Sequence, residues 1–213
     1  ALAAGAGWEL LGQLRDRGLG RRELDSLVGA LHREEGSLHP KVCTSVISAY
    51  GRQRRWRDAL HFLAGLPASA MEPSLITYSA AMAACEKDGQ WEQALGLLAE
   101  VLRGGFEPDA AAFNAAVSAC KRAERWQQAA GLLAAMRRHS VAPNVISFGA
   151  AASACAPSGR WRQALGLLAE MVACGLSPEV MCCSAVVSAC AQGEAWEQAL
   201  ELLRRMRREG PEP

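Results

Sequence analysis

The sequence has little net charge, few aromatic residues other than tryptophan, and no long apolar run. Its 213 residues include 23 Lys and Arg against 22 Asp and Glu, a formal net charge of +1. Bulk charge therefore does not predict a polyanionic partner, and a nucleic-acid site would have to come from local arrangement. Four Phe and two Tyr favour packed helices over sheet. The apolar runs fall far short of the roughly 20 residues that span a membrane, so we expect no membrane partner.

Signatures of catalysis, metal binding and phosphate binding are missing as well. The four His do not cluster, and the sequence contains no CxxC pair, no HExxH motif and no Gly-rich phosphate loop. Zinc sites, zinc peptidases and nucleotide sites need those spacings because their ligands must converge on one point. We therefore expect a chain that is not an enzyme, with no metal, no other cofactor and no small-molecule substrate.

The eight cysteines do not indicate a disulfide framework. Four of them, Cys85, Cys120, Cys155 and Cys190, recur at one position of a repeated helix. Packed helices lie about 8 to 10 Å apart, whereas a disulfide needs Cα atoms within roughly 7 Å. We predict small buried core thiols and hence a reducing compartment.

A strict 35-residue period organises what is present. It is marked by Trp56, Trp91, Trp126, Trp161 and Trp196, and by Pro73, Pro108, Pro143 and Pro178. A period of this length predicts a solenoid, in which each repeat buries its apolar face against the next. The predicted repeats are 40–74, 75–109, 110–144, 145–179 and 180–213, in one continuous domain. Residues 1–39, with Trp8 and Leu11 on one predicted helix face, follow the pattern poorly and read as a degenerate or capping repeat.

Each repeat divides into two amphipathic helices. In repeat 75–109, Tyr78, Met82 and Cys85 fall at i, i+4 and i+7, and a second apolar face starts at Trp91. The first stripe recurs as Phe113, Val117 and Cys120, as Phe148, Ala152 and Cys155, and as Cys183, Val187 and Cys190. We predict that both faces are core, with the Trp side chains buried, so that replacing one by Ala costs about 3 to 5 kcal/mol.

The unit LITYSAAMAACEKDGQWEQALGLLAEVLRGGFEPD, residues 75–109, resembles the P-type 35-residue repeat of the pentatricopeptide repeat (PPR) family. Tetratricopeptide repeats run at 34 residues and carry their Trp in the first helix, whereas here the Trp opens the second helix. The resemblance covers residues 40–213 well and 1–39 poorly. It implies an all-α fold, a right-handed α-solenoid (superhelix) of helix-turn-helix repeats.

The same resemblance implies sequence-selective binding of single-stranded RNA in an organelle, one base per repeat, in RNA processing, stability or translation. In that family the fifth and last residues of a repeat contact the base edge. Carried over, these are Thr44 with Ser74, Ser79 with Asp109, Asn114 with Asn144, Gly149 with Glu179, and Ser184 without a partner. In chain order the pairs resemble a purine pair, a guanine pair, a pyrimidine pair that prefers cytosine over uracil, and no established pair.

The family's second residue packs on the base face. That place holds Lys41, Ile76, Ala111, Ile146 and Met181. Lys41 and Ala111 depart from the apolar pattern, and Ala111 offers a base little to pack on. Lys87 and Lys121, at the ends of first helices, are placed for backbone phosphates.

Each of these interpretations has a structural alternative. Ser74, Asp109 and Asn144 are also preferred helix N-cap types and directly precede predicted helices. Small residues along the same helix edge also suit tight helix packing. The many Arg residues of second helices and turns are predicted to be a solvated surface.

The alternative function is a protein-binding scaffold or structural subunit of a large organellar assembly, which would make other organellar proteins its partners. Near-neutral charge, Ala111, Gly149 and Glu179 favour it. Residues 1–7, ALAAGAG, are too short for a signal peptide, and the sequence does not begin with Met. We therefore expect an organellar targeting segment, mitochondrial or chloroplast, upstream of this sequence.

Overall fold

The computed structural model describes residues 12, 14, 19–33, 40–67 and 72–209. These residues form eleven α-helices, and no strand is present among them. The helices are α2 (Arg21–Arg33), α3 (Pro40–Arg52), α4 (Trp56–Gly65), α5 (Leu75–Lys87), α6 (Trp91–Arg103), α7 (Ala110–Arg122), α8 (Trp126–Arg138), α9 (Val145–Cys155), α10 (Trp161–Ala173), α11 (Val180–Gln192) and α12 (Trp196–Glu209). The prediction of an all-α helical repeat array is confirmed. Trp8 and Leu11 of the predicted degenerate repeat, and residues 210–213 of the last repeat, lie outside the described residues.

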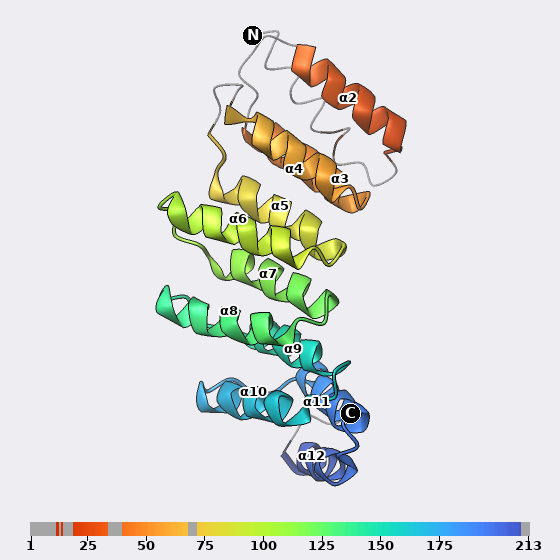
Figure 1. Cartoon of the computed structure of the whole chain (residues 1–213), viewed down its shortest axis with the longest axis vertical. Helices are drawn as coiled ribbons and strands as arrows, with labels where there is room; N and C mark the ends of the chain where they lie inside the picture. Colours follow the sequence, from red (N-terminus) through yellow and green to blue (C-terminus); the bar gives the residue numbers. More distant parts are fainter. Residues whose placement is uncertain (1–11, 13, 15–18, 34–39, 68–71, 210–213) are drawn as a thin grey trace. The chain divides into compact units, whose positions relative to one another are not determined.

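The helices fall into two compact blocks. The first block holds residues 1–88 and 92–107, and the second holds residues 89–91 and 108–213. In the first, α3 packs on both α4 and α5. In the second, α9 packs between α7 and α11, and each of these helices also contacts the helix that follows it, α8, α10 or α12 (Figure 1). Repeat packing is thus seen within each block, while the exact boundaries predicted for the repeats, and their continuity in one domain, stay a prediction.

Small residues let the first helices of neighbouring repeats approach closely. A Cβ atom added to Gly51 of α3 would lie 2.9 Å from Cβ of Ala84 on α5, closer than carbon atoms pack.

The apolar stripes predicted on the first helices of the repeats lie in the core of α7 and α9, because Phe113, Cys120 and Phe148 are all almost fully buried. In the corresponding stripes of α5 and α11, Tyr78 and Val187 are only half-buried.

Each second helix begins at its Trp as predicted, but the prediction that these side chains are buried is wrong. Trp126 and Trp161 are half-buried, and Trp196 is 64% exposed. The residues three places further on, such as Ala129 and Ala164, are the fully buried ones. These Trp side chains therefore lie at the edge of the core. An Arg from the next repeat covers the rings of Trp91 and Trp126, and the guanidinium carbon of Arg160 lies 5.5 Å from the ring centre of Trp126. The rings of Trp56 and Trp161 are covered by an Arg of their own repeat.

The turn between the two helices of a repeat uses the left-handed backbone region. Gly89 and Gly159 have φ of 65° and 59° there. Arg54, Glu124 and Glu194 occupy the same place with φ of 56°, 58° and 55°, although side chains with a Cβ disfavour it. The turn geometry is thus set by the packing of the two helices and not by the residue at its centre.

Seven of the eight cysteines are buried and all eight are free thiols. Burial raises the pKa of the Cys120 and Cys155 thiols to about 11. The prediction of small buried core thiols holds for these seven. Cys174, just after α10, is exposed and is the exception.

Candidate nucleic-acid interface

The predicted base-face residues all lie in the first turn of a first helix, and all are exposed. Among the apolar ones, Ile76 is 69% exposed, Ile146 55% and Met181 49%. Lys41 and Ala111 are exposed at the same place on α3 and α7. Large apolar side chains repeated at one register and left in water are a feature of surfaces that bind something, and a flat base can cover them.

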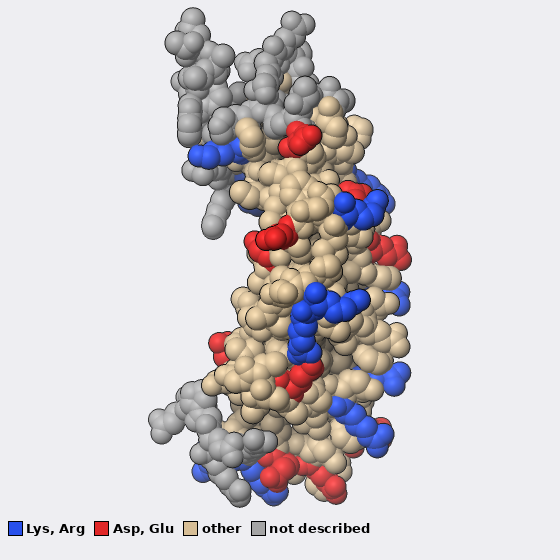
Figure 2. All heavy atoms as spheres, turned by 90° about the vertical axis from the view of Figure 1, so that its left-hand side faces the viewer, with Lys and Arg blue, Asp and Glu red and all other residues tan. Residues whose placement is uncertain are grey.

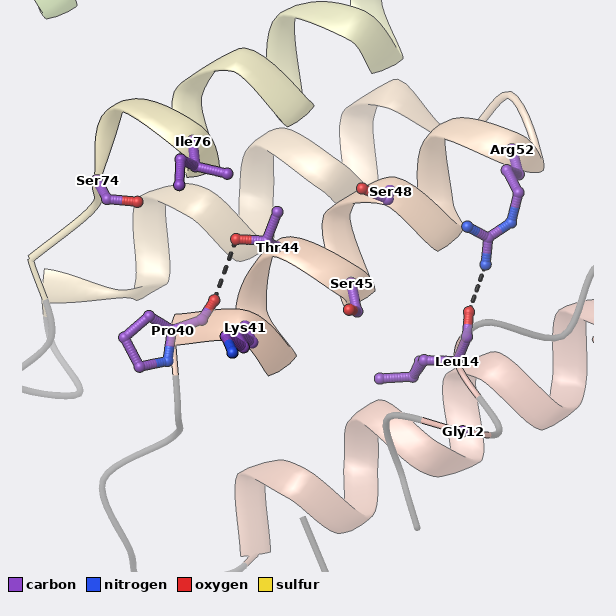
Figure 3. A pocket seen from close by; sticks show the side chains of 10 residues that line it. All are labelled: Gly12, Leu14, Pro40, Lys41, Thr44, Ser45, Ser48, Arg52, Ser74 and Ile76. Atoms are coloured by element: carbon purple, nitrogen blue, oxygen red, sulfur yellow. Dashed lines mark hydrogen bonds between the residues drawn. The ribbon is translucent and has the colours of Figure 1, made fainter. Parts of the chain in front are cut away.

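The three predicted base contacts of repeat 40–74 line one cavity together with the base-face residue of the next repeat. Lys41, Thr44, Ser74 and Ile76 surround a space of about 650 Å³ (Figure 3). The Thr44 hydroxyl donates to the carbonyl of Pro40 at 3.0 Å, which leaves its lone pairs for a ligand. The cavity continues past Ser45 and Ser48 to Arg52, whose guanidinium donates to the carbonyl of Leu14.

In repeat 110–144 the predicted base-edge pair is in direct contact. Asn114 Nδ2 of α7 donates to Asn144 Oδ1, at 3.4 Å, across 30 residues of sequence. The buried hydroxyl of Ser147 on α9 lies 2.6 Å from Asn114 Oδ1 and 3.0 Å from Asn144 Oδ1. Both amides are only half-buried, so a ligand can reach them. The structure thus brings the fifth and last residues of this repeat together.

The pair predicted for repeat 75–109 is divided between the blocks. Ser79 lies half-buried on α5, in the first block. Asp109 lies exposed before α7, in the second. Their joint contact with a base stays a prediction.

The pair in repeat 145–179 differs from the others in having one polar side chain. Gly149 is buried, and a Cβ added to it would lie 3.1 Å from Cys182 Sγ, a tight contact with α11. Glu179 is exposed, and its side chain makes no capping hydrogen bond to the start of α11. Ser184, in the last repeat, is exposed and donates to the carbonyl of Met181 at 3.0 Å.

The alternative interpretation as N-caps is correct for three of the last residues. The side chain of Ser74 accepts from the Thr77 N–H, that of Asp109 from the Ala112 N–H at 2.8 Å, and that of Asn144 from the Ser147 N–H at 3.0 Å. A cap occupies one acceptor site of an oxygen that has two or more. Capping therefore leaves these side chains able to contact a base.

The predicted solvated surface holds for some Arg residues and not for others: the Arg54 side chain is 71% exposed, whereas that of Arg55 is 12% exposed. Arg55 is paired with Asp25 at 2.7 Å and with Asp58 at 2.6 Å, and Arg137 is paired with Glu170. On the face shown in Figure 2, cationic and anionic side chains are interspersed on a largely uncharged surface. Lys87 ends α5 half-buried, and Lys121 lies exposed near the end of α7.

Two polar residues that the sequence analysis did not single out are Thr77 and Ser147. They are 2% and 0% exposed, and they are the two buried polar side chains among the described residues. Each is the third residue of its repeat and bonds to the last residue of the preceding one. A hydroxyl side chain at the third position of a repeat, on an otherwise apolar helix face, is the sequence pattern from which these two residues could have been predicted.

No group of three or more His, Cys, Asp or Glu that could hold a metal ion occurs in the part of the chain that is described. Within the same part, no helix is both long and apolar enough to cross a membrane.

Comparison with solved structures shows the fold. The crystal structure of the pentatricopeptide repeat protein PPR10 from maize matches with a TM-score of 0.71 and 24% identity, over 90% of this chain and 28% of that one. PPR10 in complex with an 18-nt psaJ RNA element matches with a TM-score of 0.67 and 23% identity, over 92% of this chain and 33% of that one. The chain thus spans about a third or less of PPR10.

The PPR domain of Arabidopsis thaliana protein-only RNase P 1, in complex with tRNA, matches with a TM-score of 0.68 and 14% identity, over 82% of this chain and 93% of that one. A search of curated proteins finds no match. The PPR repeat model matches residues 41–65, 76–106, 146–176 and 181–211, and the pentatricopeptide repeat domain model matches residues 96–156. These matches cover more than half of the chain, which therefore belongs to the pentatricopeptide repeat family.

Proposed function

We propose that this chain binds single-stranded RNA sequence-selectively, one base per repeat, and that it acts as a binding module without catalysis. The observation that carries the proposal is the combination, at one register, of exposed apolar side chains and converging polar groups. Ile146 exposes an apolar surface at the start of α9, and the amides of Asn114 and Asn144 meet beside that helix start. Single-stranded RNA is recognised in this way, by stacking on the base face and by hydrogen bonds to the base edge.

Stacking and edge contacts together contribute about 1 to 3 kcal/mol per base. The repeats of this chain differ in what they can contribute. Repeat 145–179 has large apolar side chains at its own start and at the start of the next repeat, Ile146 and Met181, whereas repeat 110–144 starts with Ala111. We therefore expect weak binding by this chain alone, with a preferred order of purine, guanine, cytosine or uracil, any base, and purine from 5′ to 3′.

Family membership supports a proposal for the cellular role. Members of the PPR family generally work in organelles, and two of the solved structures that resemble this chain hold RNA. We propose a mitochondrial or chloroplast protein that acts on the processing, stability or translation of transcripts. Other proteins of the same compartment are secondary partners.

A gel-shift titration tests the proposal directly. The chain is titrated against a labelled RNA that contains purine-G-C and against a scrambled RNA of the same composition. We expect tighter binding to the first. Equal binding to both would remove the claim of sequence selectivity, and binding to neither would remove the claim of RNA binding.

Substitution of an exposed base-face residue separates RNA contact from folding. Ile146→Ala should weaken binding by roughly tenfold, within the range for loss of stacking on one base. It should hardly change the melting temperature, because the side chain is 55% exposed. Val172→Ala is the matched control, since Val172 is 46% exposed but lies on α10, a second helix. Equal effects of the two substitutions on RNA affinity would contradict the proposed interface.

A protein-binding scaffold is the second candidate. It is favoured by Glu179, an exposed carboxylate that lies next to the exposed apolar Val180 and Met181 and would repel phosphates. Salt dependence distinguishes the two functions. RNA affinity should fall linearly with the logarithm of salt concentration, with a slope set by the number of phosphate contacts, whereas binding through an apolar protein interface should hardly respond.

A further inference from the structure

Ser147 sets the direction of the two amides in repeat 110–144, one through its main-chain N–H and the other through its buried hydroxyl. The main-chain N–H of Ser147 donates to Asn144 Oδ1 at 3.0 Å, and the main-chain N–H of Asn144 donates to Ser147 Oγ at 3.2 Å. A main-chain N–H is always a donor. The Asn144 amide must therefore turn its oxygen toward Ser147, and the Ser147 oxygen must accept from Asn144.

The proton of the Ser147 hydroxyl is then available for Asn114. Its oxygen lies 2.6 Å from Asn114 Oδ1, the shorter of its two contacts with amide oxygens. Because a hydroxyl proton needs an acceptor, Asn114 also turns its oxygen inward, and its Nδ2 donates to Asn144 Oδ1 at 3.4 Å. Four hydrogen bonds thus form one connected set around a side chain that is 0% exposed.

This set leaves amide N–H groups for a ligand. Asn144 Oδ1 already accepts from the Ser147 N–H and from Asn114 Nδ2, so both of its lone pairs are used. Both N–H groups of Asn144 and one N–H of Asn114 make no hydrogen bond within the described residues. Toward a bound base, the pair therefore acts chiefly as a donor.

Among the four bases, cytosine fits two neighbouring donors best. Its Watson–Crick edge presents two adjacent acceptors, N3 and O2, whereas in uracil an N3–H donor separates the two carbonyl oxygens. Adenine presents one acceptor beside an amino group, and guanine presents two adjacent donors. We propose that Ser147 is a positioning residue that makes repeat 110–144 select cytosine over uracil: its main-chain N–H holds the Asn144 oxygen inward, and its hydroxyl holds the Asn114 oxygen inward beside it. The inference rests on the proposed RNA-binding function.

The other repeats show what the array accepts at this register. Val42, Thr77, Ala112 and Cys182 occupy it, and all are buried. Asp109 caps α7 through the N–H of Ala112 without any side-chain hydroxyl there. Replacement of Ser147 by Ala, Thr or Cys should therefore leave the helices folded, which makes these substitutions suitable probes.

The test compares two labelled RNAs, AGCAA and AGUAA, that differ only at the base facing repeat 110–144. By fluorescence anisotropy we expect wild type to prefer the cytosine RNA by roughly tenfold, the lower part of the range for a good pair of base contacts. Ser147→Ala keeps the main-chain N–H that holds Asn144 Oδ1 but frees the Asn114 amide to rotate, so this preference should fall to below about twofold. Ser147→Thr restores the hydroxyl and should restore the preference. Thr77→Ala is the matched control, since it removes a hydroxyl at the same register elsewhere and should leave the ratio unchanged.

Circular dichroism of each variant establishes that it is folded, and Ser147→Cys, with the residue found in the next repeat, serves if the Ala variant is not. A ratio that stays near the wild-type value in a folded Ser147→Ala variant would overturn the inference while leaving RNA binding intact. Equal affinity of wild type for the two RNAs would do the same. Binding of wild type to neither RNA, nor to the purine-G-C probe, would overturn the proposed function and the inference together.

Discussion

At the residue scale, four of the five repeated Trp side chains lie at the edge of the core beneath the guanidinium of an Arg. Trp126 is half-buried and lies beneath the guanidinium of Arg160, which belongs to the next repeat. A cation over an indole ring contributes about 0.5 to 1 kcal/mol at an exposed site. The contact therefore ties neighbouring repeats together, but less strongly than complete burial would.

Trp126→Ala should lower the free energy of unfolding by about 2 kcal/mol, less than the roughly 3 to 5 kcal/mol expected of a fully buried Trp. Urea unfolding followed by circular dichroism measures the difference. Trp196→Ala is the control, because that side chain is 64% exposed and should cost less. If Trp126→Ala lowered the free energy of unfolding by as much as the loss of a fully buried Trp, the partial exposure of Trp126 would not explain its contribution to stability.

Single residues also show where prediction from sequence reached its limit. The stripe of Phe113, Val117 and Cys120 could be predicted as core because helical periodicity alone places three apolar residues on one face. The role of Ser147 could not be predicted from the sequence. Its hydroxyl matters because it meets Asn114, 33 residues away on another helix, and no local pattern encodes that meeting.

At the scale of elements, the turn inside each repeat is more constant than the residue at its centre. Glu124 has a φ of 58°, and Gly89 has a φ of 65° at the equivalent place. Glu124 is exposed. The left-handed conformation costs a residue with a Cβ about 1 to 2 kcal/mol, whereas a Gly loses roughly 0.5 to 1 kcal/mol more in backbone entropy.

Glu124→Gly should therefore stabilise the protein by about 0.5 kcal/mol, the difference between these two effects. Gly89→Ala should destabilise it by about 1 kcal/mol, because the new Cβ is strained and would lie 3.3 Å from Cβ of Arg122. Thermal unfolding of the two variants beside wild type checks both signs. If Glu124→Gly lowered the melting temperature instead, the conclusion that helix packing and not the central residue sets this turn would be contradicted.

At the scale of the whole molecule, the period of 35 residues brings buried thiols into the core at regular intervals. Burial raises the pKa of the thiols of Cys43, Cys120 and Cys155 to about 11, and that of Cys85 to about 12, from the ordinary 9.0. Below about pH 9 these thiols hold their protons in the folded and unfolded chain alike. Above it, the unfolded chain loses protons that the folded one keeps, so the free energy of unfolding falls as pH rises.

We expect stability to fall between about pH 9 and pH 11, by at most about 1.4 kcal/mol per pH unit for each buried thiol. Urea unfolding at about pH 8 and pH 10 measures the change. A Cys120→Ala, Cys155→Ala double variant controls for Lys and Tyr, which titrate in the same range. The double variant should lose less stability between the two pH values than wild type does, and an equal loss would show that the thiols do not contribute.

The sequence by itself determined the helix-turn-helix repeat, its family and the register of the candidate RNA contacts, because a strict period of Trp, Pro and apolar stripes encodes local structure that repeats identically. Only the tertiary structure decided how each of these residues is used. It left four of the five repeated Trp side chains half-buried beneath an Arg, packed Gly149 tightly against Cys182, and joined Asn114, Asn144 and Ser147 in one hydrogen-bonded set. Burial and hydrogen bonding of this kind depend on which side chain a neighbouring helix presents, and sequence spacing alone does not specify that.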